Sequence, residues 1–141
     1  MGTFNKFQDF SEQVAKGVHV FGTHSFKLAL TNSAPVATNT VLANITQIAN
    51  GNGYTTGGAA VPNLTCTESS GITTVAADQV VFTATGAMGT FRYLVLYNDT
   101  AASDNLVGWW DHGSTVSLQA GETYTFKFND TATGGTILTL S

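Results

Sequence analysis

The sequence has very few charged residues. Only 9 of its 141 residues are Asp or Glu and 5 are Lys or Arg, which leaves a net charge of −4. About a quarter of the residues in an ordinary globular domain are charged. Five scattered basic residues do not make the clustered positive patch that binds nucleic acid or an anionic membrane surface. We therefore expect neither nucleic acid nor membrane as a partner.

Cysteine and long apolar runs are also scarce. Cys66 is the single cysteine, so no disulfide forms within the chain, and no Cys/His cluster is spaced to hold zinc. Cys66 lies in an alternating Thr-Cys-Thr run, which predicts a small buried apolar residue on a strand. No apolar run approaches the roughly 20 residues of a membrane-spanning helix. Residues 1–21 lack the apolar core of a secretory signal, so we expect no export signal.

Threonine is the residue that the sequence has in excess. There are 23 threonines. The β-branched side chain suits a pleated strand, and its hydroxyl keeps a surface polar without a formal charge. Charged residues are depleted where a surface is buried by a partner. The composition therefore favours a structural or binding role.

The N-terminal segment has the spacing of an amphipathic helix. Its apolar residues recur every three or four positions, at Phe4, Phe7, Phe10, Val14 and Val18. We assign residues 1–20 to an N-terminal helix and arm. Two interpretations stay open, because the phenylalanine face can pack on the domain's own core or dock on another subunit.

From Phe21 onward the period changes to two, which predicts strands. The clearest is Phe91–Tyr97, with Phe91, Tyr93, Val95 and Tyr97 on one face and Leu94 and Leu96 on the other. A strand that is apolar on both faces is expected at the centre of a covered sheet. Residues 36–48 are ambiguous between a short helix and a loop with a strand. The other predicted strands are 25–31, 64–67, 73–76, 80–85, 106–111, 115–118, 123–128 and 136–140.

Seven or more short strands separated by regular turn signals predict an antiparallel β-sandwich, of jelly-roll or Ig-like type, over residues 21–141. The fold class is therefore all-β with one short N-terminal amphipathic helix. We find no internal repeat and no linker that would divide the β-sandwich domain.

Motifs that carry chemistry are weak. His19 and His24 would fall on opposite faces of an extended segment, which does not suit shared metal binding. An Asp111–His112 dyad would need a turn, because adjacent strand residues point apart. The glycine-containing run 50–57 misses the third glycine of a dinucleotide loop and is better interpreted as a turn.

Two polar turns contain side-chain oxygens of the kind that bind calcium. Asn98-Asp99 and Asp104-Asn105 could offer oxygens to calcium, but the EF-hand spacing is absent and loop capping is favoured. We therefore predict no catalytic residue, no cofactor and no metal site, and we expect the protein not to be an enzyme.

Trp109 and Trp110 are the residues that suggest a ligand or an interface. Adjacent strand residues face opposite ways, so one indole belongs in the core and the other at an interface or under a loop. Stacking on a sugar ring is the alternative for an exposed indole. The candidate interface residues are Phe7, Phe10, Val14, Trp109 and Trp110.

Several stretches resemble a family of small structural proteins of tailed bacteriophages. The similarity lies in residues 26–35 (FKLALTNSAP), 41–48 (VLANITQI) with 50–54 (NGNGY), 91–99 (FRYLVLYND) and 106–111 (LVGWWD). The resemblance implies a non-enzymatic virion protein, made in the cytoplasm of the host bacterium. It implies no catalytic residues.

Within that family, a capsid decoration (cement) protein that binds and stabilises the capsid exterior is the preferred function. Its expected partners are the major capsid protein and further copies of itself, with a trimer as one form. The alternative is a tail or fibre component that binds a host surface glycan. An enzyme such as a glycan hydrolase ranks behind both, because it needs paired carboxylates and the acidic residues fall mainly at predicted turns.

Overall fold

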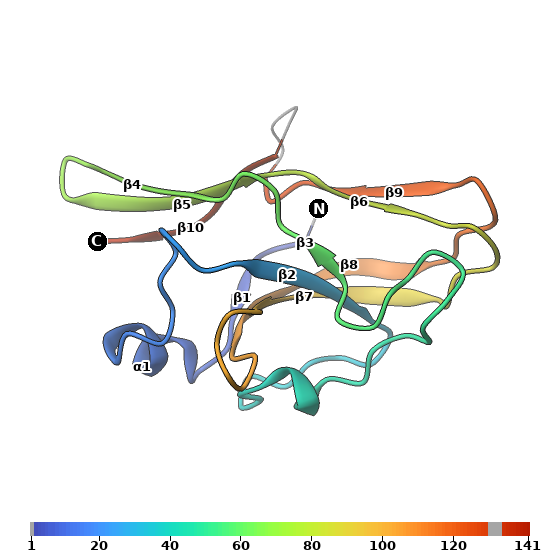
Figure 1. Cartoon of the computed structure of the whole chain (residues 1–141), viewed down its shortest axis with the longest axis horizontal. Helices are drawn as coiled ribbons and strands as arrows, with labels where there is room; N and C mark the ends of the chain where they lie inside the picture. Colours follow the sequence, from blue (N-terminus) through green and yellow to red (C-terminus); the bar gives the residue numbers. More distant parts are fainter. Residues whose placement is uncertain (1, 130–133) are drawn as a thin grey trace.

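The computed structural model describes residues 2–129 and 134–141, and it confirms the predicted all-β fold with one short helix. Two layers of antiparallel strands enclose the main core (Figure 1). The described strands are β1 (Asn5–Lys6), β2 (Phe26–Thr31), β3 (Ala59–Ala60), β4 (Thr65–Ser69), β5 (Ile72–Asp78), β6 (Val80–Thr83), β7 (Phe91–Asn98), β8 (Leu106–Val116), β9 (Thr123–Phe126) and β10 (Gly134–Leu140).

One layer is a five-stranded sheet with the order β1-β8-β7-β2-β3. Strand β7 lies at its centre, as its two apolar faces predicted. Leu94 and Leu96 point into the main core between the layers, while Val95 and Tyr97 belong to a second cluster on the sheet's other face. That second face is covered in part by Leu42 and Ile45, from the loop that fills residues 32–50. The ambiguous segment 36–48 is thus a loop, with a short 3-10 turn at Leu42–Asn44.

The predicted face of Phe91 is wrong. Phe91 packs in the main core with Leu94 and Leu96, although simple alternation places it with Tyr93. The register of β7 against β8 shifts between Phe91 and Tyr93. The pairing moves two positions along β7 and five along β8, so three extra residues lie in β8 here and the alternation of faces does not continue across this irregularity.

The second layer consists of a three-stranded sheet, β10-β5-β4, and a two-stranded sheet, β6-β9. Strand β9 pairs with β6 and not with β8, although the turn at 119–121 joins it to β8 in sequence. Figure 1 shows the hairpin of β4 and β5 running out to one end of the molecule, near the C-terminus and above helix α1.

Helix α1 (Phe10–Ala15) is shorter than the helix that the apolar spacing over residues 4–18 predicts. Residues 5 and 6 form β1, which pairs with β8 through Asn5↔Trp109 and Lys6↔Gly108. The backbone hydrogen bonds offered by β8 therefore hold the first phenylalanines in an extended segment. No helix in residues 2–129 or 134–141 is long and apolar enough to cross a membrane.

Candidate functional site

The predicted interface residues lie mostly inside the chain's own core. Phe7, Phe10 and Trp110 are at most 3% exposed, while Val14 and Trp109 are half-buried. Phe10 packs in the main core and Phe7 in the second cluster. Of the two interpretations of the phenylalanine face, the structure therefore favours packing on the domain's own core.

The two tryptophans point to opposite sides of the five-stranded sheet, as predicted. Trp110 contacts Phe4 and Phe126, with ring centroids 5.2 and 5.0 Å away. Trp109 packs against Phe7, with centroids 4.6 Å apart. Trp110 is 1% exposed and offers no open ring face for stacking on a sugar, while Trp109 is half-buried against Phe7.

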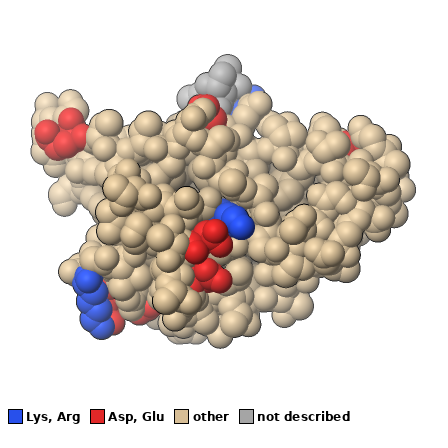
Figure 2. Space-filling model, viewed as in Figure 1, with Lys and Arg blue, Asp and Glu red and all other residues tan. Residues whose placement is uncertain are grey.

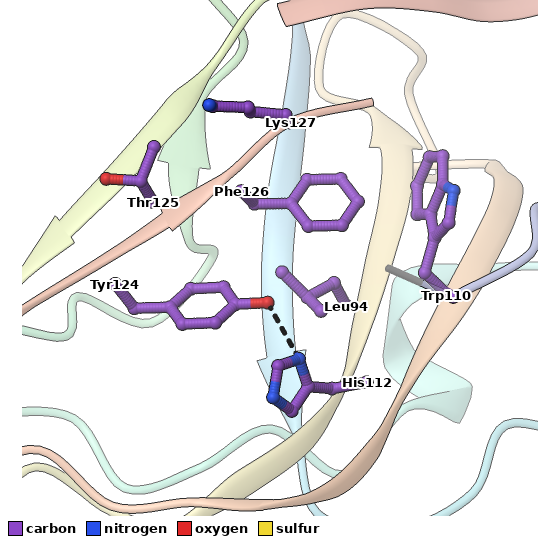
Figure 3. A pocket seen from close by; sticks show the side chains of 8 residues that line it. Leu94, Trp110, His112, Tyr124, Thr125, Phe126 and Lys127 are labelled. Carbon is purple, nitrogen blue, oxygen red and sulfur yellow. Dashed lines mark hydrogen bonds between the residues drawn. The ribbon is translucent and has the colours of Figure 1, made fainter. Parts of the chain in front are cut away.

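A cavity of about 290 Å³ opens between β8 and β9. Leu94, Trp110 and Phe126 form its apolar floor, and Tyr124 points across its mouth to His112 (Figure 3). The Tyr124 hydroxyl lies 3.2 Å from Nδ1 of His112. The side chains of Thr125 and Lys127, which also line the cavity, extend away from the floor.

The chemistry available in this cavity is limited. Its lining contains no carboxylate, serine or cysteine, so it lacks the paired acids of glycoside hydrolysis and a nucleophile with an adjacent base. Burial raises the pKa of the Tyr124 hydroxyl, which therefore stays protonated near neutral pH. The cavity is an apolar recess with one polar pair at its rim.

His19 and His24 are brought together, contrary to the expectation for an extended segment. The chain turns between them, and the His24 amide donates to the Val20 carbonyl at 2.9 Å. Nδ1 of each imidazole then lies near Nδ2 of Asn98, at 3.2 Å for His19 and 3.0 Å for His24. This cluster joins the turn after α1 to the end of β7.

The proton positions in the cluster follow from the amide of Asn98. Its Oδ1 accepts hydrogen bonds from the backbone amides of Thr100 and Ala101, so Nδ2 is the atom that faces the histidines. Nδ2 has two N–H donors and cannot accept, so an Nδ1 that hydrogen-bonds to it must be the acceptor, as in neutral imidazole. Burial, with His24 nearby, lowers the pKa of His19 to about 4. Nε2 of His19 is buried without a hydrogen-bond partner among the described residues.

The other weak motifs have structural roles. Asp111 forms two hydrogen bonds with Arg92, at 2.7 and 3.0 Å, and the guanidinium lowers the pKa of the Asp111 carboxyl. Asp111 is therefore engaged away from its neighbour His112. Asn98 caps its own loop as predicted, and residues 51–54 close a turn through a Gly51↔Tyr54 bridge. The described residues contain no group of three or more His, Cys, Asp or Glu that could hold a metal ion.

The three-stranded sheet carries a surface that the sequence only partly indicates. All five residues of β4 are exposed, and Cys66 among them is exposed and not buried as predicted. Cys66 is paired with the buried Val75, but the sheet extends beyond the core at this strand. An alternating strand thus does not guarantee that its apolar positions are covered.

Threonines from three strands form a row on the outer face of this sheet. Thr67 is paired with Thr74, which is paired in turn with Thr139. Cross-strand partners share a face, and this face is opposite to the one on which Val75 enters the core. Within the described part of the chain, none of these three side-chain hydroxyls makes a hydrogen bond. The Thr-x-Thr pattern at 65–67 indicates one strand of the row, but the pairing with β10 spans more than sixty positions and leaves no local signal.

The charged residues leave most of the surface neutral. Figure 2 shows broad uncharged areas between a few small acidic and basic clusters.

Comparisons with models of protein families, with curated proteins and with solved structures each found no match. The surface chemistry and the strand pattern therefore carry the functional proposal.

Proposed function

We propose that the protein is a non-enzymatic bacteriophage structural protein that decorates and stabilises the capsid exterior. The observation that carries this proposal is the outer face of the sheet β10-β5-β4 at one end of the molecule (Figure 1), where Thr67 and Thr139 are exposed and Thr74 lies half-buried between them. We name this surface the threonine face. The resemblance of residues 26–35, 41–48, 50–54, 91–99 and 106–111 to virion proteins points to the same class of function.

The threonine face suits docking on another protein. Hydroxyl groups cost much less to remove from water than charged groups, and each can donate and accept hydrogen bonds with an irregular backbone. Single contacts of this kind are weak, but many copies on one shell multiply them. The expected partners are the major capsid protein and further copies of the chain itself.

The copy number in purified particles tests the location. Quantitative mass spectrometry against the major capsid protein should give hundreds of copies per particle. About three to twelve copies would contradict a capsid location and favour the tail or fibre alternative, in which the protein binds a host glycan.

A pair of variants tests the threonine face. Thr74→Lys places a charge in the middle of the row and should weaken binding to particles. Thr115→Lys places the same charge on an exposed position of β8, outside the face, and should leave binding unchanged. Equal binding of both variants and the natural protein would overturn the assignment of this face.

A further inference from the structure

We infer that two copies of the chain pair through the outer edges of their β4 strands, so that their three-stranded sheets join across a twofold axis. Strand β4 is at the edge of its sheet, and no described strand pairs with its outer side. Its five residues are all exposed, so a second strand can approach along its whole length. This pairing does not depend on the virion location and can be measured on the purified protein.

The turn after β4 fixes which of its backbone groups face outward. Ser69 and Ile72 flank a two-residue turn in which Ser70 and Gly71 have φ of 52° and 82°. Such a turn directs the Ser69 carbonyl and the Ile72 amide toward each other. Backbone groups alternate along an antiparallel strand. Those of Thr65, Thr67 and Ser69 therefore face β5, and those of Cys66 and Glu68 face the open edge.

A twofold axis at Thr67 satisfies these outward groups within one dimer. It places Cys66 of one copy opposite Glu68 of the other, twice, and Thr67 opposite its own counterpart. Each outward pair exchanges two bonds, so the contact forms about four backbone hydrogen bonds. Glu68 is the only charged residue of β4, and this register does not place it opposite its own counterpart.

The two edges of the sheet differ in their protection against pairing. Strand β10, the opposite edge, has a register shift between Thr136 and Leu138. Such bulges, together with lysine and proline, are the devices that keep edge strands from associating. Strand β4 has no bulge, lysine or proline. The unprotected edge is therefore the one that accepts a second copy.

Sedimentation of the purified protein tests the pairing. The mass should rise with concentration from the 14.7 kDa of one chain to twice that value. Thr67→Lys places two like charges opposite each other on the axis and should weaken the dimer at least about tenfold. Thr65→Lys leaves the new charge opposite Ser69 and should weaken it far less. A monomer at all concentrations, or equal effects of the two variants, would overturn the proposal.

Cross-linking tests the register. Thr67 and its counterpart form a pair without mutual hydrogen bonds, whose Cα atoms lie about 4.5 Å apart, within the range of a disulfide. In a Cys66→Ser background, Thr67→Cys should form an intermolecular disulfide under mild oxidation, and Thr65→Cys should not. Cross-linking of Thr65→Cys at the same or a higher rate would overturn the Thr67-centred register.

Discussion

The side-chain amide nitrogen of Asn98, Nδ2, lies 3.2 Å from Nδ1 of His19, which is 79 positions away in the sequence. The same nitrogen also lies 3.2 Å from the Val18 carbonyl and 3.0 Å from Nδ1 of His24. One NH₂ group thus has three acceptors around it and binds the turn after α1 to the end of β7. Burial holds His19 in the neutral form, whose Nδ1 can accept from this NH₂ group.

The first prediction concerns pH. The folded state holds the pKa of His19 at about 4, below the ordinary 6.5 that the unfolded chain recovers. Between these two pH values the His19 imidazole is protonated in the unfolded chain but neutral in the folded protein. The contribution of His19 to stability is therefore complete above pH 6.5 and is lost as the pH falls toward 4. The free energy of unfolding should decrease by about 2 kcal/mol between pH 7 and pH 5. Urea unfolding at both pH values measures it. His19→Phe, which cannot titrate, should flatten the dependence, and an equally steep fall in that variant would assign the effect to another group.

The second prediction reverses the sign of this dependence. Asn98→Asp keeps an oxygen for the amides of Thr100 and Ala101 but places a carboxylate beside His19 and His24. A carboxylate raises the pKa of a neighbouring imidazole. The variant should therefore gain stability, relative to the natural protein, as the pH falls from 7 to 5. Asn98→Ala is the control, because it loses every bond of the side chain and should be destabilised at both pH values by about 2 kcal/mol or more. An equal loss of stability in Asn98→Asp and Asn98→Ala at both pH values would show that the Asn98 amide serves only to cap its loop.

The third prediction concerns the helix. Phe10 is 3% exposed in the main core, and Val14, one turn later on the same helix, is half-buried. Phe10→Ala should lower the free energy of unfolding by about 3–5 kcal/mol. Val14→Ala removes less buried surface and should cost about 1 kcal/mol. Thermal and urea unfolding compare the two variants, and equal small losses would mean that the helix lies loosely on the core.

A fourth prediction concerns Gly58, which has φ of +83°. A Cβ at this position would lie 2.0 Å from the Leu28 carbonyl oxygen. Gly121 has a similar φ of +87° but has open space around it, so Gly121→Ala should cost only the backbone strain of about 1–2 kcal/mol. Gly58→Ala adds a collision with β2 and should cost a further 1–3 kcal/mol. Similar stabilities of the two variants would contradict the close packing of this loop on β2.

The strand pattern and the centre of the sheet were predictable from sequence, because alternation is local. The apolar residues on both faces of 91–97 correctly placed β7 in the middle of its sheet. The bulge beside Phe91 has no such local signal and reversed the face of that residue. Phe4 and Phe7 fit a helical spacing, but the hydrogen bonds of β8, about one hundred positions away, hold them in an extended segment.

The candidate sites were less predictable, because they depend on long-range pairing. The opposite orientation of Trp109 and Trp110 followed from strand geometry alone. The meeting of His19 and His24 at Asn98 requires a turn and a contact across the domain. The exposure of Cys66 and the threonine row requires knowledge of how far the sheet extends beyond the core. Where the ladder is regular, alternation shows which residues share a face, but it does not show whether that face is covered.

Rebinding of the protein to particles from which it has been removed tests decoration of the capsid directly. Decoration predicts saturable rebinding at hundreds of sites, preference for intact capsids over free capsid subunits, and a higher melting temperature of the particle. Rebinding of only a few copies at one vertex or at the tail, or strong binding to host polysaccharide, would contradict decoration of the capsid.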